Sequence, residues 1–333
     1  MGPSLGNGWI CLAAYRPNLE LLAIQIDSIR KQTVTTWRCV IGVDGKDSVV
    51  RDAIIDMVAE DSRFTVHEFP VNVGFYRNFE RLLASTPPGV DWVALSDQDD
   101  EWFPEKLETL LPFLKHTSLA FGQAFVVDIA RSRENPAIAV RRSAGLAAAL
   151  IDNQVTGCMS VFRRDLVDLA LPFPAETDAA FHDHWLGLCA LVSDGVGVSS
   201  EPLQNYVQHG ANVIGEERRS GLRSRLRRLA EVSNRGQSTG LDYISEHRWG
   251  WRVSMAKTLV HRVPSGRIAD LKVLSAVADD RLTPLLFRIL ARDVVAGRAP
   301  ALRAAGLLLG AARSPRRRAR LLLASPRPGK PQR

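Results

Sequence analysis

The sequence predicts an α/β fold, in which a mostly parallel sheet carries helices on both faces. The first 110 residues alternate four times between a short apolar run and a segment whose apolar residues recur at helical spacing. Strands that alternate with helices form parallel sheets, because each helix returns the chain to the same edge. An apolar fraction of 46% and a charged fraction of 24% are ordinary for a globular chain with a large core.

The four strand–helix units can be placed on the chain. Asn18 is suited to cap a helix that has Leu19, Leu22, Ile26 and Ile29 on one face. The next two helices bury Val50, Ile54, Met57 and Val58, then Phe75, Phe79, Leu82 and Leu83, and Pro104 opens a fourth. The expected strands are Trp9–Tyr15, Trp37–Val43, Phe64–Phe69 and Trp92–Leu95.

The order of elements changes after residue 120. Ala120–Asp128 and Val155–Phe162 read as strands, Ala130–Arg142 as a polar loop, and Phe181–Trp185 as the start of a helix. A glycine inside an apolar run, such as Gly157, often marks the close approach of a ligand or a bulge.

Four carboxylates follow the fourth strand within five residues: Asp97, Asp99, Asp100 and Glu101. Ligands of open α/β sheets bind at the carboxyl ends of the strands. Crowded carboxylates ionise most easily around a cation, and their hard oxygens suit Mg²⁺ or Mn²⁺. The alternative is a solvated loop in which Asp99 or Asp100 caps the next helix.

Asp44 ends the second strand as Asp97 ends the fourth, so both point to the same edge of the sheet. Such a carboxylate can accept from the imide of uracil or thymine, or from a ribose hydroxyl. The alternative is an ordinary Asp-Gly turn.

Two histidine-containing clusters lie further along the chain. Asp183 stands between His182 and His184 and before Trp185, an arrangement suited to proton transfer. Asp183 as a helix cap and Trp185 as a core residue are the alternatives. His209, at the end of a short strand, is of a type that ligates metals, although a single loop histidine usually does not.

Taken in order, these clusters resemble the bacterial rhamnosyltransferase-like branch of the family 2 glycosyltransferases, which have the GT-A fold. The resemblance covers about residues 9–215. The matching segments are Ala14-Tyr15, Gln25–Ile29 with Gln32-Thr33, Asp44-Gly45, Asn72–Gly74 with Asn78–Glu80, Leu95–Trp102, Thr156–Cys158, Phe181–Trp185 and Tyr206–Asn212.

The resemblance implies roles for individual positions. Asp44 would contact the nucleotide base, Asp97 the ribose and diphosphate, and Asp183 would be the catalytic base. Asp99 and His209 would bind a divalent Mg²⁺ or Mn²⁺ ion, and His182 and Trp185 would contact the acceptor. The remaining donor-binding positions would be Ala14, Tyr15, Asn72, Gly74, Asn78, Gln98, Thr156 and Gly157.

The activity that the resemblance implies is inverting, metal-dependent transfer of a sugar such as L-rhamnose. The donor would be a thymidine or uridine diphosphate sugar, and the acceptor a hydroxyl of a cell-surface glycan or lipid-linked saccharide. The chain departs from many relatives at Val43-Asp44-Gly45-Lys46, where two acids and a serine are common. This departure concerns the base and ribose contacts rather than the chemistry.

Two other functions were weighed. A sugar-nucleotide pyrophosphorylase would need a glycine-rich basic loop after the first strand, where this chain has Tyr15-Arg16-Pro17-Asn18. A non-catalytic scaffold in a polysaccharide assembly complex would be expected to lose the acids, and Asp97, Asp99 and Asp183 are all present.

The charge of the chain is divided unevenly. Residues 1–215 carry 17 basic and 27 acidic side chains, whereas residues 216–333 carry 26 and 9. We therefore expect a transferase domain over 1–215, a basic helical region over 216–324 and a disordered tail over 325–333. Basic amphipathic segments at 218–229 and 316–323 favour an anionic membrane surface, with packing on the catalytic domain or a dimer interface as alternatives. No nucleic-acid-binding motif accompanies the charge.

Cys11, Cys39, Cys158 and Cys189 are scattered, so we expect buried, reduced thiols. The sequence shows no secretory signal and no apolar stretch of about 20 residues, and the expected location is the cytoplasm, peripherally on the inner face of the plasma membrane.

Overall fold

The computed structural model describes residues 6–128, 137–140, 142–177, 179–208, 243–264 and 266–324, and side chains as far as residue 314. The described parts of 1–145, 153–173 and 181–208 form one compact unit. A second unit combines 146–152 and 174–180 with the C-terminal helices. The predicted boundary at 215 lies outside the described residues, and two short segments of the first half belong to the second unit.

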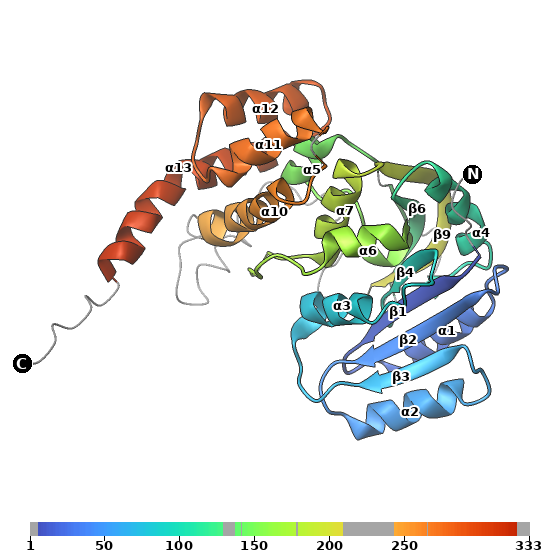
Figure 1. Cartoon of the computed structure of the whole chain (residues 1–333). Coiled ribbons are helices and arrows are strands. Elements are labelled where there is room, and N and C mark those ends of the chain that lie inside the picture. The colour runs from blue at the N-terminus through green and yellow to red at the C-terminus, as the bar shows by residue number, and fades with distance from the viewer. Residues whose placement is uncertain are drawn as a thin grey trace, which may run out of the picture. The chain divides into compact units, whose positions relative to one another are not determined.

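The first four strands and three helices follow the predicted alternation (Figure 1). The strands pair in the order β3-β2-β1-β4, and all three pairings are parallel. Asn18 caps α1 as expected, since its side chain accepts from the backbone N–H groups of Glu20 and Leu21. The elements are β1 (Gly8–Ala14), α1 (Leu19–Arg30), β2 (Trp37–Val43), α2 (Ser48–Val58), β3 (Phe64–Glu68), α3 (Gly74–Ala84) and β4 (Trp92–Ser96).

Helices cover both faces of this parallel half. Ile10 and Leu12 of β1 belong to a fully buried cluster with Leu22 of α1. On the opposite face of β2, Gly42 lies so close to α3 that an added Cβ would be 2.7 Å from the side chain of Leu82. Successive side chains along each strand point to opposite faces of the sheet, so each strand contributes to two core layers.

The second half of the sheet is mixed rather than mostly parallel. β8 pairs antiparallel with β4, and β6 pairs antiparallel with β8 but parallel with β9. The full order is β3-β2-β1-β4-β8-β6-β9-β5, with β7 paired to β6. The elements are β5 (Glu101–Trp102), α4 (Lys106–Leu110), the 3₁₀ helix η1 (Leu111–Lys115), β6 (Leu119–Asp128), β7 (Ala137–Ala139), α6 (Arg164–Ala170), α7 (His182–Val192) and β9 (Val196–Gln208).

Two expectations for this half were wrong. Val155–Phe162 is not one strand, because a 3₁₀ turn η2 (Gly157–Met159) precedes a short β8 (Ser160–Arg163). The Ser160 hydroxyl closes this turn by donating to the Gly157 carbonyl. The stretch predicted as a loop also contains β7, which the apolar residues 137–139 form by pairing with β6.

The second unit is helical. Its core includes the indoles of Trp249 and Trp251, both buried, and the Trp249 indole donates to Asp280. The segment 316–323, expected as a separate amphipathic piece, continues helix α13. The elements are α5 (Leu146–Ile151), the π-helical turn η3 (Ile244–Trp249), α10 (Gly250–Val260), α11 (Ile268–Ala278), α12 (Pro284–Val295) and α13 (Ala301–Ala324).

Neither the basic segment predicted over 218–229 nor the tail predicted over 325–333 falls within the described residues. None of the helices in the described ranges combines the length and the apolarity needed to cross a bilayer.

Candidate active site

The carboxyl ends of β1, β2 and β4 lie at one edge of the sheet, as the parallel register requires. Tyr15, Asp44 and Asp97 each follow one of these strand ends. The expected placement of the acids at a common edge is therefore confirmed by the topology.

The loop that carries the acids is tied to the loop after β1. The Gln98 side chain accepts from the Tyr15 backbone N–H at 2.7 Å and donates to the Tyr15 carbonyl at 3.2 Å. The Tyr15 side chain is 46% exposed. Gln98 thus joins two loops that sequence analysis assigned to the donor site.

Buried polar side chains of α1 hold the same acidic loop through hydrogen bonds. The Gln25 amide donates to the Ser96 hydroxyl at 2.8 Å, and the Ser28 hydroxyl accepts from the Trp102 backbone N–H at 3.0 Å. Gln32 makes further bonds to the backbone beyond Trp102. Gln25 and Ser28 of α1 and Gln32 just beyond its end, which sequence analysis matched without assigning a role, therefore fix the path of residues 96–107.

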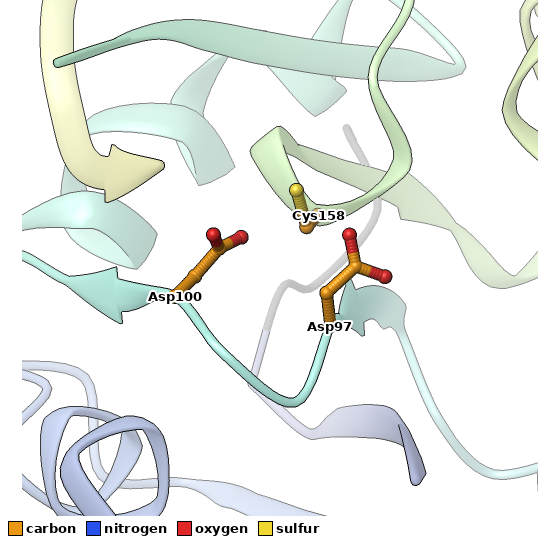
Figure 2. Close-up of side chains that lie close together, drawn as sticks. All are labelled: Asp97, Asp100 and Cys158. Atoms are coloured by element: carbon orange, nitrogen blue, oxygen red, sulfur yellow. The ribbon is translucent and has the colours of Figure 1, made fainter. Parts of the chain in front are cut away.

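Asp97 and Asp100 face the thiol of Cys158, which lies on η2 (Figure 2). Each of the three side chains offers one ligand atom, and these atoms all lie within 4.8 Å of one another. Burial raises the pKa of both carboxyl groups, and the neighbouring charges, including that of Asp99, raise them further. The carboxylates therefore need positive charge nearby in order to ionise.

One positive charge is built into the fold. Lys106 is fully buried, and its ammonium group donates to the Cys158 carbonyl at 2.5 Å and to the Gln204 side chain at 2.6 Å. It also lies 3.6 Å from the centroid of the Trp102 ring. The Gln204 amide in turn donates to Asp100 at 2.9 Å. Lys106 therefore orients Asp100 through the side chain of Gln204. Burial lowers the pKa of Lys106.

The donor set fits a hard divalent cation in part. Carboxylate oxygens of Asp97 and Asp100 are the ligands that Mg²⁺ and Mn²⁺ prefer. The Cys158 thiol does not fit, because a soft sulfur ligand suits Zn²⁺ rather than Mg²⁺ or Mn²⁺. Asp99, the residue expected to bind the metal, is not in this group of described residues, although its charge acts on both Asp97 and Asp100.

Asp183 lies in the first turn of α7, close enough to raise the pKa of Asp97 by its charge. One of its oxygens accepts from the Asn153 amide at 2.9 Å and from the His184 backbone N–H at 2.6 Å. The helix cap is Phe181 rather than Asp183. Asp183 thus lies near enough to the acidic loop for its charge to act on Asp97, and its role as a base stays a prediction.

His182 is buried beside this site in an unusual way. Within the described residues neither ring nitrogen has a hydrogen-bond partner. The ring centroid lies 4.0 Å from that of Phe79, and an added Cβ at Gly157 would lie 2.5 Å from the His182 Nε2 atom. Burial lowers the pKa of His182 to about 3, so the imidazole is neutral at neutral pH. Gly157 is needed because it leaves room for this ring.

Trp185 lies in the core instead of facing an acceptor. It is fully buried, and its indole donates to the Ala170 carbonyl at 2.9 Å. The packing alternative noted from the sequence fits this position, and stacking on a sugar does not.

Asp44 is held by three donors at the end of β2. Its two oxygens accept from the backbone N–H groups of Val73 and Gly74, both at 2.9 Å, and the Arg81 guanidinium donates at 2.7 Å. The Asp44 side chain is only 2% exposed. In this structure the carboxylate fixes the start of α3, and Asp44 is not among the charges that raise the pKa of Asp97.

The other predicted donor-binding residues lie near these elements. Asn78 is buried and bonds the Gly42 carbonyl and Arg81, while the Asn72 amide reaches the Asp44 carbonyl at 3.4 Å. Ala14 is the buried end of β1, Thr156 precedes η2, and Gly74 begins α3 with a φ of 78°. His209 lies outside the described residues.

Sequence reasoning did not find Lys106, Gln204 or Asn153. Lys106 follows Pro104-Glu105 and reads as an exposed residue of a helix start, and Gln204 lies 98 positions away. The only sequence feature that points to Asn153 is its position shortly before the Thr156–Cys158 segment, and this position does not predict a bond to Asp183.

Comparison with known proteins agrees with this geometry. A model of the family described as "Glycosyl transferase family 2" matches residues 9–169. A search of proteins with curated functions finds no match. Among solved structures the chain is similar to S. aureus TarS 1–349 in complex with UDP-GlcNAc, with a TM-score of 0.50 and 13% identity over 87% of this chain and 92% of that one. It is also similar to the mannosyltransferase PcManGT from Pyrobaculum calidifontis in complex with GDP-Man and Mn²⁺, with a TM-score of 0.47 and 14% identity over 92% and 86% of the two chains.

The mixed sheet and the acid-bearing strand edge define a GT-A fold, and the protein is a glycosyltransferase. The family 2 glycosyltransferase model matches residues 9–169, a little under half of the chain.

Proposed function

We propose that the protein transfers a sugar from a nucleoside diphosphate to an acceptor hydroxyl with inversion at the anomeric carbon. The observation that supports this most directly is the approach of Asp183 to the acidic loop, with one oxygen held by Asn153 and by the first turn of α7. A base beside the site of a leaving diphosphate is what an inverting displacement needs.

The reaction requires a proton acceptor because a sugar hydroxyl is a poor nucleophile. Asp183 takes the hydroxyl proton while that oxygen forms a bond to the anomeric carbon. The bond from this carbon to the diphosphate breaks, and the diphosphate leaves with the electron pair. Asn153 keeps the carboxylate aimed, because an Asp side chain fixed through one oxygen cannot rotate freely.

The acidic loop would hold a divalent cation through Asp97 and Asp100, with Asp99 as the ligand that the family resemblance implies. When bound, Mg²⁺ or Mn²⁺ neutralises the charge that develops on the leaving diphosphate. Gln98 joins the acidic loop to the loop after β1, and α1 fixes its backbone. The chain thereby holds the carboxylates in place before the donor arrives.

The exposed Tyr15 is the residue best placed for a further substrate contact, whereas the ring nitrogens of His182 are buried and would have to be uncovered to reach an acceptor. A neutral His182 has one donor and one acceptor nitrogen that make no bond within the described residues. Acceptor recognition by His182 is therefore part of the proposal. Asp44 is assigned to donor binding by the resemblance, and its three bonds favour an indirect role through α3.

The donor is best sought among nucleoside diphosphate sugars, with thymidine diphosphate L-rhamnose and uridine diphosphate sugars first. The acceptor would be a hydroxyl of a cell-surface glycan or a lipid-linked saccharide. Peripheral association with a membrane would fit such an acceptor.

The test is a panel of nucleoside diphosphate sugars with Mn²⁺ or Mg²⁺, followed by determination of the anomeric configuration of the product. Asp183→Asn is expected to bind the donor in calorimetric titration and to lose transfer by a factor of about 10³ or more. Asp56→Asn, at an exposed position of α2, is the matched control and should behave as the unaltered chain. A retained anomeric configuration, or full activity of Asp183→Asn, would contradict the proposal.

A further inference from the structure

The C-terminal helices α12 and α13 expose apolar side chains that a folded protein normally buries. On α12 the side chains of Leu285, Phe287 and Val295 are 50%, 54% and 88% exposed. On α13 Leu302 and Leu309 are 55% and 41% exposed. Isolated exposed apolar side chains are common, but five of them on two helices that pack together need a reason.

The exposed residues of α12 occupy one side of the helix. Leu285, Arg288, Arg292 and Val295 follow one another at spacings of three and four, which places them in a single stripe. The buried residues Leu286, Leu290 and Asp293 lie on the opposite side. The outward half of the helix therefore combines apolar side chains with two arginines. We name Leu285, Phe287, Arg288, Arg292, Val295, Leu302 and Leu309 the outer face.

The segment that carries the outer face has very few acidic residues of its own, although Asp152 and Asp279 from elsewhere in the chain pair with Arg303 and Arg281. Residues 281–324 contain ten arginines, no lysine and a single acid, Asp293. Asp293 is buried and pairs with Arg298 and, at 3.9 Å, with Arg292, so this single acid is shared by two arginines. Arg288 has no ion-pair partner among the described residues, and the Arg292 side chain is 71% exposed.

We propose that the outer face of α12 and α13 docks on an anionic lipid bilayer. Amphipathic helices of this kind lie in the interface plane, with leucine, phenylalanine and valine side chains among the acyl chains and arginines at the headgroup phosphates. The proposal concerns binding only and does not depend on the roles assigned to Asp97 or Asp183.

Other occupants fit the outer face less well. A second copy would bring a further set of arginines against the first, and like charges repel. The residues that follow α13, 325–333, add Arg327, Lys330 and Arg333, so the tail has the same sign of charge. A nucleic acid would satisfy the arginines but would leave Leu285, Phe287 and Val295 against a phosphate backbone.

The test is flotation of the full-length protein with vesicles of phosphatidylcholine alone and with vesicles containing about one third phosphatidylglycerol. We expect binding to the anionic vesicles, weaker binding in high salt because the arginine attraction is screened, and little binding to the neutral vesicles. Binding to both kinds of vesicle with equal strength would overturn the anionic part of the proposal.

Two double variants locate the surface. Arg288→Gln with Arg292→Gln, and Phe287→Glu with Val295→Glu, are each expected to weaken binding to anionic vesicles on the order of tenfold or more. Val49→Glu with Ile55→Glu places the same charges at exposed apolar positions of α2, and this control should bind as the unaltered chain does. Thermal unfolding of each variant reports whether the fold is kept.

Three results would overturn the proposal. The unaltered chain could fail to float with any vesicle. Both outer-face variants could bind as tightly as the control, which would assign membrane binding to the other basic segment, 218–229. Finally, light scattering could show self-association that Phe287→Glu with Val295→Glu abolishes while no variant binds lipid, which would assign the face to a second copy.

Discussion

Asp44 and the pair Asp97 and Asp100 lie at the same edge of one sheet but have opposite surroundings. Asp44 receives two backbone N–H bonds and an arginine. Asp100 is buried and Asp97 is half-buried, both are close to the charge of Asp99, and the pKa values of both carboxyl groups are raised. The first carboxylate has its counter-charge in direct contact, whereas the second group has Lys106, which reaches Asp100 through Gln204, and we propose that a bound cation supplies the rest.

This difference separates two kinds of acid that look alike in a sequence. An acid after a parallel strand can anchor the next helix or can bind a ligand. The donors that surround it decide between the two, and these come from residues distant in the chain. The predictions that follow use this contrast.

Among the residues of this comparison, the largest effect is expected for Asp97→Asn. Transfer should fall by about 10² to 10³, because a ligand of the proposed cation is lost where charge develops on the leaving group. Without divalent cations the free energy of unfolding should stay the same or rise, because like-charge repulsion within the acidic loop is relieved. Steady-state kinetics and urea unfolding in the presence of a chelator measure the two quantities. A loss of stability as large as that of Asp44→Ala would show that Asp97 is an anchor of the same kind.

Asp44→Ala is expected to lower the free energy of unfolding by about 3 kcal/mol, since it leaves a partly buried arginine and two N–H groups without their acceptor. Urea unfolding measures this change. Asp52→Ala removes an exposed aspartate that also pairs with an arginine, and it should cost less than about 1 kcal/mol. Equal effects of the two variants would contradict the anchoring role of Asp44.

His182 provides a third case, a buried group that has no partner within the described residues. Its native pKa of about 3 lies below the ordinary value of about 6.5, so the native state binds fewer protons than the unfolded chain between these values. The stability that His182 contributes is present at pH 7 and is lost as the pH falls below about 6.5.

Between pH 7 and pH 5 this loss amounts to about 2 kcal/mol. His182→Leu should remove it, and the difference in unfolding free energy between the variant and the unaltered chain should change by that amount over the interval. His116→Leu, at an exposed histidine, is the control. A pH-independent difference would mean that His182 is protonated or solvated in the native protein.

The smallest of these effects is expected for Lys106→Met. The ratio kcat/KM should fall about tenfold, because Gln204 and the Cys158 carbonyl lose their common donor and Asp100 loses its support. A double-mutant cycle with Asp100→Asn should show coupling between the two positions. Strict additivity of the two changes would show that Lys106 acts on stability and not through Asp100.

The predictable parts of the molecule are those set by local pattern. Asn18 caps α1 because its side chain precedes a helical repeat, and the positions of Asp44 and Asp97 follow from strand ends. The same patterns could not show that Asp44 meets Arg81, 37 positions away, or that Lys106 is buried against Gln204. Both contacts depend on the packing of elements that are remote in sequence.

Gly157 illustrates a pattern whose cause differs from the expected one. A glycine in an apolar run predicts the close approach of a ligand or a bulge, and the group that approaches Gly157 is the His182 ring. The expected strand was wrong at that point because η2 turns the chain so that Cys158 faces the acids. A short apolar run does not by itself distinguish a strand from a short buried helical turn.

The most direct test of the contrast is Mn²⁺ titration followed by electron paramagnetic resonance, with Mn²⁺ alone and with uridine, thymidine or guanosine diphosphate. The account predicts one bound Mn²⁺ in the unaltered chain and in Asp44→Ala, and loss of at least tenfold in affinity in Asp97→Asn. Unchanged Mn²⁺ affinity in Asp97→Asn, or an equal loss in Asp44→Ala, would contradict it.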